Sequence, residues 1–445
     1  MPFLMALFIM LSAKGESNIL GNNVTISIFI PIFYHLEYTF FNMKQQNTAV
    51  IVIPTYNEAD NVGRMIEYLN TKTFPNIVAK KNNLTESWDM KILVVDGNSP
   101  DGTGKVVEKE AKKYDNTFLL TETSKDGIGA AYLKGFKYAI DKLNADFVFE
   151  FDGDFQHPPE TIPLMLKAME EGYDYVIGSR KIKGGSNPKG WGLKRVFFSE
   201  VGGFTARFMM FFPFKNFFKV TDPTTGLKVT RVKGFVDKMD LDYSRLLTRS
   251  FGYKLQLLFE TLKMGAKFKE VPLQFHVRNA GESKIEPKTA KDIFRVAFLL
   301  RWYDDFTQKF LKFGIVGLTG FVINTVGAKI FKSGIINTNL NISWINGISN
   351  ALAAEIAIIS NFIFNNIWTF SKEKITNISI LFPKFITFNL SSLITGILIP
   401  STIIALLTSI FGDHLFIYQI IAIFGITVPL NWFVYNKFIW KNKKK

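Results

Sequence analysis

Four long apolar stretches near the carboxyl terminus constrain this 445-residue chain more than any other feature. They run roughly over 312–332, 345–367, 383–409 and 415–437. Each is close to the roughly 20 residues that an α-helix needs to cross a bilayer. Asn, Ser, Thr and Gly recur in them, which is typical of membrane helices that pack on one another. The stretches predict an all-α four-helix transmembrane domain over residues 301–445; a buried helical bundle in a soluble protein is the alternative.

Positive residues lie on one side of these stretches and predict their orientation. They are Arg301, Lys309 and Lys312 before the first stretch, Lys372 and Lys374 between the second and third, and Lys441 and Lys443–Lys445 after the last. By the positive-inside rule we expect a multi-pass protein of the cell membrane, with the preceding domain and the carboxyl terminus in the cytoplasm. The net charge of +15 suits an anionic membrane surface. No nucleic-acid-binding motif is present, so we expect the lipid bilayer and not nucleic acid as the partner.

Residues 1–42 fit poorly with the rest of the chain. The run MPFLMALFIML has no positive residue before it, so it is a weak signal peptide. Met43 begins MKQQNTAVIVIPTYNE, which has the character of a natural start. We interpret residues 1–42 as an upstream extension with a wrongly assigned start codon; an amphipathic segment on the membrane surface is the alternative. Sequencing of the natural amino terminus distinguishes them.

Residues 43–300 alternate between strand-like and helix-like patterns. The strand-like runs are 49–53, 91–96, 117–121, 146–151 and 174–179, and helical patterns lie between them. This alternation predicts an α/β domain with a parallel sheet and helices on both faces. Ligands of such sheets bind outside the carboxyl ends of the strands, and the polar motifs of this domain fall at those ends. The chain has no cysteine, which excludes thiolate metal sites and disulfides.

The stretch FDGDFQHPPE, residues 151–160, places Asp152 and Asp154 at the end of an apolar run. One interpretation is a polar turn that closes a strand, with Pro158 and Pro159 stopping it. The other is a site for Mg²⁺ or Mn²⁺, because these ions bind through one or two carboxylates together with substrate phosphates. The residues alone leave both interpretations open.

Further motifs lie after the other predicted strands. They are PTYNE (54–58), VVDGNSPDGTG (94–104), KDGIGAAYLKG (125–135), GSRKIKGG (178–185), WGLKRVFFS (191–199), DPTTG (222–226) and VPLQFHVRNAGESK (271–284). Together with the DGD motif they resemble the family-2 glycosyltransferases, whose catalytic domain has the Rossmann-like GT-A fold. Their order is similar to that of the dolichol-phosphate (polyprenyl-phosphate) mannosyltransferases. KFGIVGLTGFVINTVG (312–327) and SNFIFNNIWTF (360–370) resemble the GtrA-type membrane domain.

The resemblance implies a role for each matching residue. The implied donor-binding residues are Pro54, Tyr56, Glu58, Val95, Asp96, Asp152, Gly153, Arg278 and Lys284. Asp152, Asp154 and Gln156 would hold Mg²⁺ or Mn²⁺ on the donor diphosphate. Arg180, Arg195 and Ser199 would hold the acceptor phosphate, because the fork of arginine suits bidentate phosphate recognition. The implied catalytic residues are Asp154, Arg180 and Arg195. His157 is expected to shape the turn, Asp222 to fix a loop and Arg207 to be structural, and Glu260 is an uncertain lining residue.

The implied reaction is transfer of a hexose to dolichyl or polyprenyl phosphate, with mannose from GDP-mannose as the favoured donor and inversion to a β-linked product. One departure concerns the donor: the family usually has two consecutive Asp residues where this chain has Asp96-Gly97. A glucosyltransferase that uses UDP-glucose therefore stays open. A processive polysaccharide synthase is disfavoured, because Phe298 stands three residues before Arg301-Trp302, where that class has Gln or Arg. A lipid-sugar translocator with an inactive catalytic domain is the alternative of another class.

Overall fold

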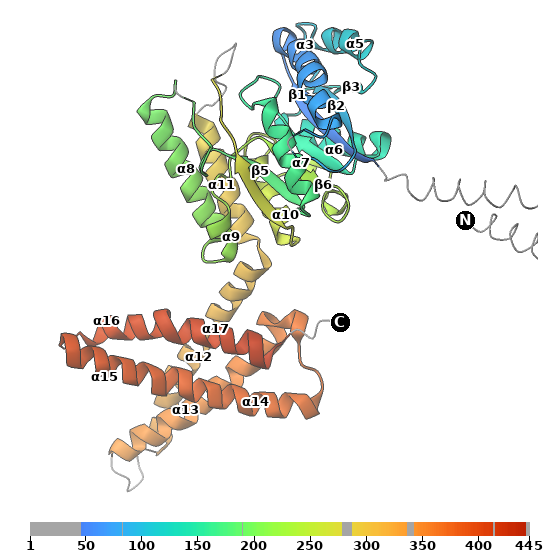
Figure 1. The fold of residues 1–445 in the computed structure, drawn as a ribbon. Helices are drawn as coiled ribbons and strands as arrows, with labels where there is room; N and C mark the ends of the chain where they lie inside the picture. Colours follow the sequence, from blue (N-terminus) through green and yellow to red (C-terminus); the bar gives the residue numbers. More distant parts are fainter. Residues whose placement is uncertain are drawn as a thin grey trace, which may run out of the picture. The chain divides into compact units, whose positions relative to one another are not determined.

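The computed structural model describes residues 46–81, 83–188, 190–277, 287–335, 342–412 and 414–441 (Figure 1). The chain divides into two compact units that part between Val296 and Ala297, within helix α11 (Pro287–Trp302). Residues 1–42, Arg278, Lys284 and residues 442–445 lie outside the described part, so the expectations for them stay predictions.

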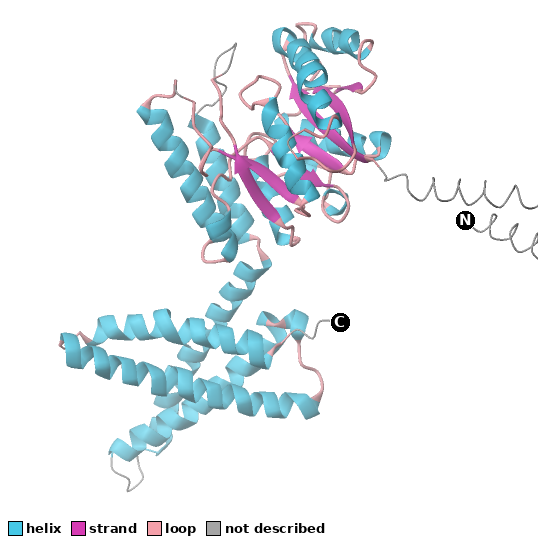
Figure 2. Ribbon diagram, viewed as in Figure 1, coloured by secondary structure: helices cyan, strands magenta, loops and turns pink. Residues whose placement is uncertain are grey.

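The first unit contains a seven-stranded sheet within the described residues (Figure 2). The strands are β1 (Asn47–Thr55), β2 (Trp88–Asp96), β3 (Thr117–Thr121), β4 (Phe147–Glu150), β5 (Tyr175–Ser179), β6 (Lys228–Arg231) and β7 (Phe268–Pro272). Their order in the sheet is β3-β2-β1-β4-β6-β5-β7. The carboxyl ends of β1, β2 and β4 are neighbours, and this edge carries the DGD motif.

The sheet is mixed, which corrects the expectation of a parallel one. Strand β6 runs antiparallel to both of its neighbours, β4 and β5, whereas the other pairs are parallel. All five predicted strands are present. Strands β6 and β7 were not predicted, because KVTR and FKEVP each contain two charged residues and no apolar run.

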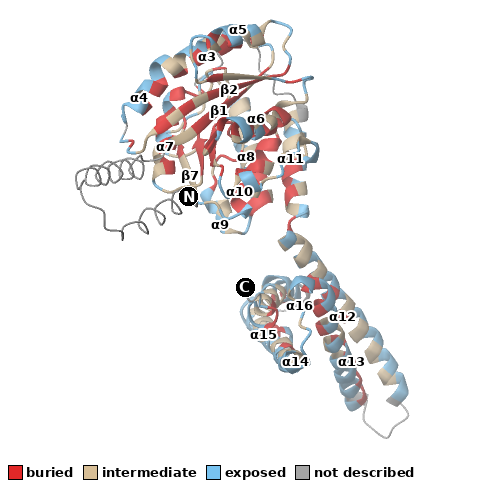
Figure 3. Ribbon diagram, turned by 90° about the vertical axis from the view of Figure 1, so that its right-hand side faces the viewer, coloured by how far each residue is buried: buried red, intermediate tan, exposed pale blue. Residues whose placement is uncertain are grey.

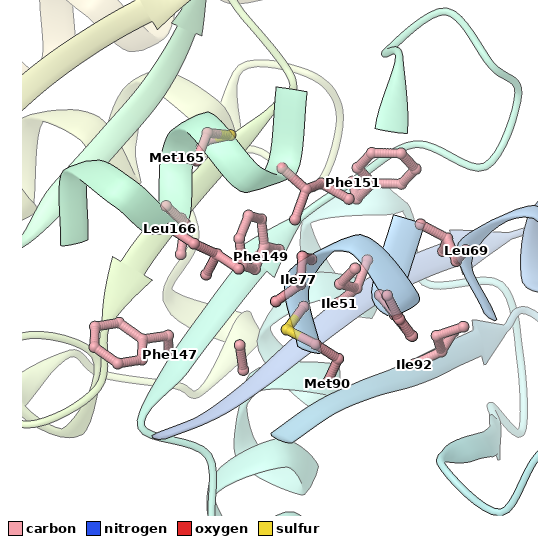
Figure 4. Close-up of a cluster of buried hydrophobic side chains, with 14 of the residues drawn as sticks. Ile51, Leu69, Ile77, Met90, Ile92, Phe147, Phe149, Phe151, Met165 and Leu166 are labelled. Atoms are coloured by element: carbon pink, nitrogen blue, oxygen red, sulfur yellow. The ribbon is translucent and has the colours of Figure 1, made fainter. Parts of the chain in front are cut away.

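Helices cover both faces of the sheet, and this explains the continuous apolar runs of its central strands. Ala49, Ile51 and Ile53 of β1 point into one core, and Val50 and Val52 point into the other. Figure 4 shows part of the first core, and Figure 3 shows buried residues gathered in the sheet. The helices packed on the first face are α3 (Ala59–Tyr68), α4 (Phe74–Val78), α5 (Thr103–Ala111) and α7 (Ile162–Glu170). Those on the second face are α6 (Ile128–Leu143) and α10 (Tyr253–Lys263).

Two further helices of this unit carry many exposed apolar side chains. They are α8 (Leu193–Phe211) and the short α9 (Lys215–Lys219). The exposed side chains are Leu193, Phe197, Phe198, Val201, Phe204, Phe208 and, on α9, Phe218. A contiguous apolar surface of this kind is typical of a contact with a membrane or a protein.

The second unit contains four helical segments that are long and apolar enough to cross a membrane within the described residues. They are Asp305–Gly334, Trp344–Thr369, Ile378–Phe411 and Ile417–Ile439. The first is α12 (Asp305–Ile335), and the second is α13 (Ile342–Phe364) with a π-helical end (Asn365–Thr369). The third joins α14 (Ile378–Leu393), a π-helical turn (Ile394–Leu398) and α15 (Ile399–Phe411). The fourth joins α16 (Leu415–Ile420), α17 (Val428–Val434) and the π-helical turns Ile421–Thr427 and Tyr435–Ile439.

An aromatic core holds these helices together at one end. Phe370 and Trp440 stack with their ring centroids 4.4 Å apart, and Phe388 packs on Tyr435 at 4.6 Å. Trp440 is almost fully buried. The predicted four-helix class of this region is confirmed, and each helical segment overlaps one of the four apolar stretches.

Candidate active site

Two loops at the carboxyl ends of β1 and β2 are joined by hydrogen bonds. The amide of Asn57 donates to Ser99 Oγ (3.0 Å), and the amide of Glu58 donates to Thr103 Oγ1 (3.0 Å). The carboxylate of Asp96 accepts from the Ser99 amide (3.0 Å) and from the hydroxyl of Thr55 (3.3 Å). Asp96 is also buried, and these hydrogen bonds fix it as the floor of this part of the site.

The predicted base-binding residues lie around this floor. Tyr56 is partly exposed, and Lys125 Nζ lies 3.6 Å from the centroid of its ring. Pro54 is also partly exposed, whereas the Val95 side chain is fully buried in the core, so only its backbone can reach a ligand. The Glu58 carboxylate accepts from the Asn61 side chain (3.0 Å).

Gly97 has a carboxylate beside it from another strand. A Cβ at this position would lie 3.3 Å from Tyr56 Cδ2 and 3.7 Å from Glu122 Oε2. Glu122 directly follows β3, and its other oxygen, Oε1, accepts from Lys134 Nζ (2.7 Å). Burial raises the pKa of Glu122, and Lys134 opposes this rise. The carboxylate that the family usually has at position 97 is thus absent, but a different one lies next to the same space.

Asp152 is held by three side chains, two of which come from helices that are distant in the sequence. The Tyr132 hydroxyl of α6 donates to its Oδ1 (3.1 Å). Lys254 Nζ of α10 and His157 Nδ1 each lie 3.6 Å from its Oδ2. Burial alone would raise the pKa of Asp152, but Lys254, then His157 and Tyr132, bring it below its ordinary value. The Asp152 carboxylate is therefore ionised and fixed in position.

Asp154 and Gln156 lie in a tight turn directly after Asp152. The Asp154 side chain is buried, and its Oδ1 accepts from the amide of Gln156 (3.1 Å). Phe155 has a positive φ of 60°, which this turn requires. The Gln156 carbonyl accepts from the amide of His276 (2.9 Å), which ties the turn to the segment after β7. A Cβ on Gly153 would lie 3.0 Å from Ile53, so little space remains beneath the turn.

His157 fills the space under the same turn. It is 2% exposed, and burial lowers its pKa to about 4. Its ring packs edge-on against Phe275, with centroids 5.0 Å apart. A neutral, buried imidazole agrees with the expectation that His157 shapes the turn.

These residues fit a divalent ion whose ligands would come partly from the protein and partly from a diphosphate. Asp152, Asp154 and the Gln156 amide supply hard oxygen ligands, which Mg²⁺ and Mn²⁺ prefer. No group of three or more His, Cys, Asp or Glu side chains that could hold a metal occurs among the described residues. Among the described residues, this turn would therefore offer the ion two carboxylates and one amide oxygen, and phosphate oxygens and water would complete the coordination.

Arg180 and Asp222 form a buried ion pair. Arg180 Nε and Nη2 donate to the two carboxylate oxygens of Asp222 at 2.7 and 2.6 Å, and the Arg180 amide also donates to Asp222 (3.1 Å). Burial alone would raise the pKa of Asp222, but Arg180 brings it below its ordinary value. Asp222 thus does more than fix its loop, because it orients the guanidinium that was predicted to hold a phosphate.

Trp191 links Arg180 to Arg195, the second predicted phosphate ligand. The guanidinium carbon of Arg195 lies 4.2 Å from the Trp191 ring centroid, and that of Arg180 lies 6.0 Å from it. Ser199 lies one turn further along α8 and is partly exposed. The two arginines, which are 15 positions apart in the sequence, therefore approach one aromatic ring.

Two residues of uncertain role lie elsewhere. Arg207 donates to the Val220 carbonyl (3.2 Å) and packs on Phe204 and Phe217, which fits the expected structural role. Glu260, on α10, accepts from Gln256 (2.9 Å), and burial raises its pKa.

Sequence reasoning missed the buried charges beneath the DGD turn. Lys254 contacts Asp152, and Lys228 Nζ lies 3.6 Å from Glu150 Oε2, which also accepts from the Tyr253 hydroxyl (3.0 Å). Both lysines are buried. The available signal was a lysine in the apolar stretch YKLQLLFETLK, because lysines are rarely buried without a partner.

Comparisons with known proteins identify both units. Residues 50–235 match the family described as Glycosyl transferase family 2, and residues 308–440 match the family described as GtrA/DPMS, transmembrane domain. The matches confirm the GT-A class of the first unit and the GtrA-like class of the second.

Named relatives agree with these matches. The chain is 29% identical to a dolichol-phosphate mannosyltransferase of Pyrococcus furiosus, over 86% of this chain and 97% of the relative. It is 31% identical to an undecaprenyl-phosphate mannosyltransferase of Micrococcus luteus, over 57% of this chain and 96% of the relative. A solved mannosyl-3-phosphoglycerate synthase of Rubrobacter xylanophilus is similar over 59% of this chain and 76% of that one, at 18% identity and a TM-score of 0.40.

Proposed function

Because the chain belongs to glycosyl transferase family 2, we propose that it transfers mannose from GDP-mannose to dolichyl or another polyprenyl phosphate. The single observation that carries the proposal is the similarity to two lipid-phosphate mannosyltransferases, one of which this chain matches across both units. Residues of the site support it, since carboxylates and paired arginines occur together at one edge of the sheet.

The donor is proposed to lie along the carboxyl ends of β1, β2 and β4. Tyr56, Pro54 and Glu58 would hold the base and ribose, with Asp96 and the backbone of Val95 beneath them. Asp152, Asp154 and Gln156 would hold Mg²⁺ or Mn²⁺ beside the diphosphate, next to Gly153. The ion, when bound, stabilises the negative charge that develops on the leaving diphosphate. Arg278 and Lys284 are proposed to add positive charge there.

The acceptor phosphate is proposed to bind at Arg180 and Arg195. Asp222 fixes the Arg180 guanidinium, which favours one orientation of a bound phosphate. Ser199 adds a hydroxyl on the same face of α8. The exposed apolar side chains of α8 and α9 suit the polyprenyl chain and the membrane from which it comes.

The chemistry is a single displacement at C1 of the sugar. An acceptor phosphate oxygen, already anionic at neutral pH, forms the bond to C1 as the bond from C1 to the donor diphosphate breaks. The diphosphate leaves with the electron pair, so the anomeric configuration inverts and an α-linked donor yields a β-linked product. No strong general base is required, which agrees with the burial and lowered pKa of His157.

The protein contains a membrane domain, and we propose the cell membrane as its location. The positive residues flanking the helices support a cytoplasmic position for the catalytic unit and the carboxyl terminus. The basic residues would also attract anionic lipid headgroups.

Gly97 favours a second candidate, transfer of glucose from UDP-glucose. To separate the two, membranes containing the full chain are incubated with polyprenyl phosphate, Mn²⁺ and labelled GDP-mannose or UDP-glucose, and the lipid is extracted. We expect labelled lipid from GDP-mannose. Label from UDP-glucose alone would replace the donor, and label from neither would contradict both.

The variant Asp154→Ala tests the metal-dependent transferase directly. We expect turnover to fall by orders of magnitude, because the leaving diphosphate loses its bound ion. Asp115→Ala, an exposed carboxylate before β3, is the matched control and should keep full turnover. Unchanged turnover in Asp154→Ala would favour the translocator with an inactive catalytic domain.

A further inference from the structure

Lys254 is a buried lysine at the candidate metal site. It lies in the first turn of α10, it is 6% exposed, and its Nζ lies 3.6 Å from Asp152 Oδ2. A buried ammonium group is unfavourable without a partner of opposite charge. The contact with Asp152 therefore explains how this lysine is tolerated, and it also occupies one face of a carboxylate that the ion would use.

Close packing holds the ammonium group and the carboxylate together. A Cβ on Gly226 would lie 2.6 Å from Lys254 Nζ, 2.9 Å from Asp152 Oδ2 and 2.8 Å from His157 Cε1. No side chain fits at this position without moving the cluster. The DPTTG motif thus ends in glycine where the backbone closes over the pair.

Two carboxylates at the turn are each paired with a lysine before any ligand binds. Glu150 pairs with Lys228, and Asp152 pairs with Lys254. Asp154, the second carboxylate of the DGD motif, is also buried, and its Oδ1 accepts from the Gln156 amide. A divalent ion arriving alone would meet two carboxylates and, next to one of them, a fixed positive charge. A diphosphate would make binding of the ion more favourable, because its negative charge is attracted both by the ion and by the ammonium group of Lys254.

We propose that Lys254 is a positioning residue that neutralises Asp152 and makes binding of the divalent ion depend on the donor diphosphate. The inference rests on the proposed function in one respect, since it takes Asp152 and Asp154 as ligands of the ion. Binding of the ion and of the nucleotide are then coupled, and the coupling acts equally in both directions. The consequence for the enzyme is that it holds the ion only together with its substrate.

The experiment measures Mn²⁺ binding to the purified full chain by the loss of the free Mn²⁺ paramagnetic resonance signal, with and without GDP. In the wild type we expect GDP to tighten Mn²⁺ binding strongly. In Lys254→Met we expect Mn²⁺ alone to bind about tenfold more tightly and the tightening by GDP to shrink by a similar factor. Lys254→Arg keeps the charge and should retain most of the coupling.

Two further variants keep the test clear. Lys263→Met makes the same chemical change at the exposed end of α10 and should leave both affinities unchanged. If Lys254→Met does not fold, Lys254→Gln removes the charge and keeps a polar group, and the same result is expected of it. Thermal unfolding shows which variants are folded.

The possible outcomes distinguish a failure of the inference from a failure of the proposed function. The same effect of GDP in Lys254→Met as in the wild type would overturn the role of Lys254 and leave the transferase standing. Wild-type protein that binds no Mn²⁺ with GDP, and none with UDP in its place, would overturn the inference together with the metal site of the proposed function. A third outcome is that the chain transfers no sugar but that GDP still tightens Mn²⁺ binding in a way that depends on Lys254. This outcome would support the inference and contradict the proposed reaction.

Discussion

The two units bury polar groups in different ways. The catalytic unit buries ion pairs: Arg180 with Asp222, Lys254 with Asp152 and Lys228 with Glu150. In the described part of the membrane unit, several buried polar side chains are joined by neutral hydrogen bonds between helices. Trp440 Nε1 donates to Asn366 Oδ1 (3.0 Å), Thr395 Oγ1 donates to Asn431 Oδ1, and Ser392 Oγ lies 3.2 Å from the Tyr435 hydroxyl.

The difference arises from what surrounds each unit and what it is proposed to bind. A buried ion pair carries a large desolvation penalty and is weak evidence for stability, but it keeps charges ready for an anionic ligand. Within a bilayer a charge is costly, whereas amide and hydroxyl groups can satisfy each other between helices. The comparison therefore predicts that single changes to charged pairs in the catalytic unit have large effects and that changes to neutral pairs in the membrane unit have small ones.

The largest effect is expected from Asp222→Ala. It leaves the Arg180 guanidinium buried without its carboxylate, and breaking a buried pair in this way typically destabilises a protein by about 3–5 kcal/mol. Thermal unfolding of the full chain in detergent, followed by loss of catalytic-unit structure, measures the change.

The control for this prediction is Asp240→Ala, which breaks an exposed pair with Arg245. Exposed pairs contribute about 0–1 kcal/mol, so this variant should unfold close to the wild type. If the two variants were equally stable, the contrast between buried and exposed charges in this unit would be wrong.

A smaller but clear effect is expected from Gly97→Asp, which gives the chain the second Asp that its family usually has. The new carboxylate would lie near Glu122, whose partner Lys134 is already shared with Asp126 (2.6 Å). Because the new carboxylate would add a like charge beside Glu122, we expect destabilisation by about 1–3 kcal/mol and no gain in turnover with GDP-mannose.

The variant Gly97→Ala distinguishes the effect of the added negative charge from the steric effect of a side chain at this position. It brings the same close contact with Tyr56 Cδ2 without a carboxylate, so it should be milder than Gly97→Asp. Higher turnover in Gly97→Asp than in the wild type would show that position 97, and not its neighbour Glu122, is where a carboxylate is needed.

In the membrane unit, Trp440→Phe removes the indole N–H that donates to Asn366 and keeps an aromatic ring beside Phe370. Loss of one neutral hydrogen bond is expected to destabilise the unit by about 1 kcal/mol, with a further loss from the smaller ring. Trp344→Phe, at an exposed position of α13, is the matched control. Unfolding of the full chain in the same detergent compares them, and a loss as large as that of Asp222→Ala would break the comparison.

Apolar periodicity predicted much of the fold because it reports burial directly. The runs in β1 and β2 are buried on both faces, so they read as continuous apolar strands, and the four membrane stretches are apolar for the same reason in a different solvent. Strands β6 and β7 were not predicted, because they are short and contain charged residues. The reversed direction of β6 depends on pairing with β4, a long-range contact that no local pattern contains.

The candidate site was predictable as a set of motifs but not as a network. The resemblance named Arg180 and Asp152, yet their partners Asp222 and Lys254 lie 42 and 102 positions away. These pairs form only in the folded chain, because no local sequence pattern shows that two residues so far apart in the sequence are in contact. The apolar neighbours of Lys254 in YKLQLLFETLK indicated that it could be buried, but its partner could be identified only from the structure.

The smallest effect is expected from acid acting on the Arg180–Asp222 pair. The pKa of Asp222 in the folded chain lies below its ordinary value of 3.8, despite burial, because of Arg180. The unfolded chain therefore binds the proton first as the pH falls. The stability that the pair contributes is fully present well above pH 4 and is lost as the pH falls toward the lower pKa of the folded chain.

At a pH equal to the ordinary value, half of the unfolded chains carry this proton, so the loss from this group is only about 0.4 kcal/mol. The measurement is the difference in unfolding free energy between the wild type and Asp222→Asn at pH 7 and near pH 4. Asn cannot titrate, so the other carboxylates cancel in the difference, which should shrink as the pH falls. A difference that grew instead would mean that the pKa of Asp222 in the folded chain lies above its ordinary value, and Arg180 would then not be the dominant influence on this carboxylate.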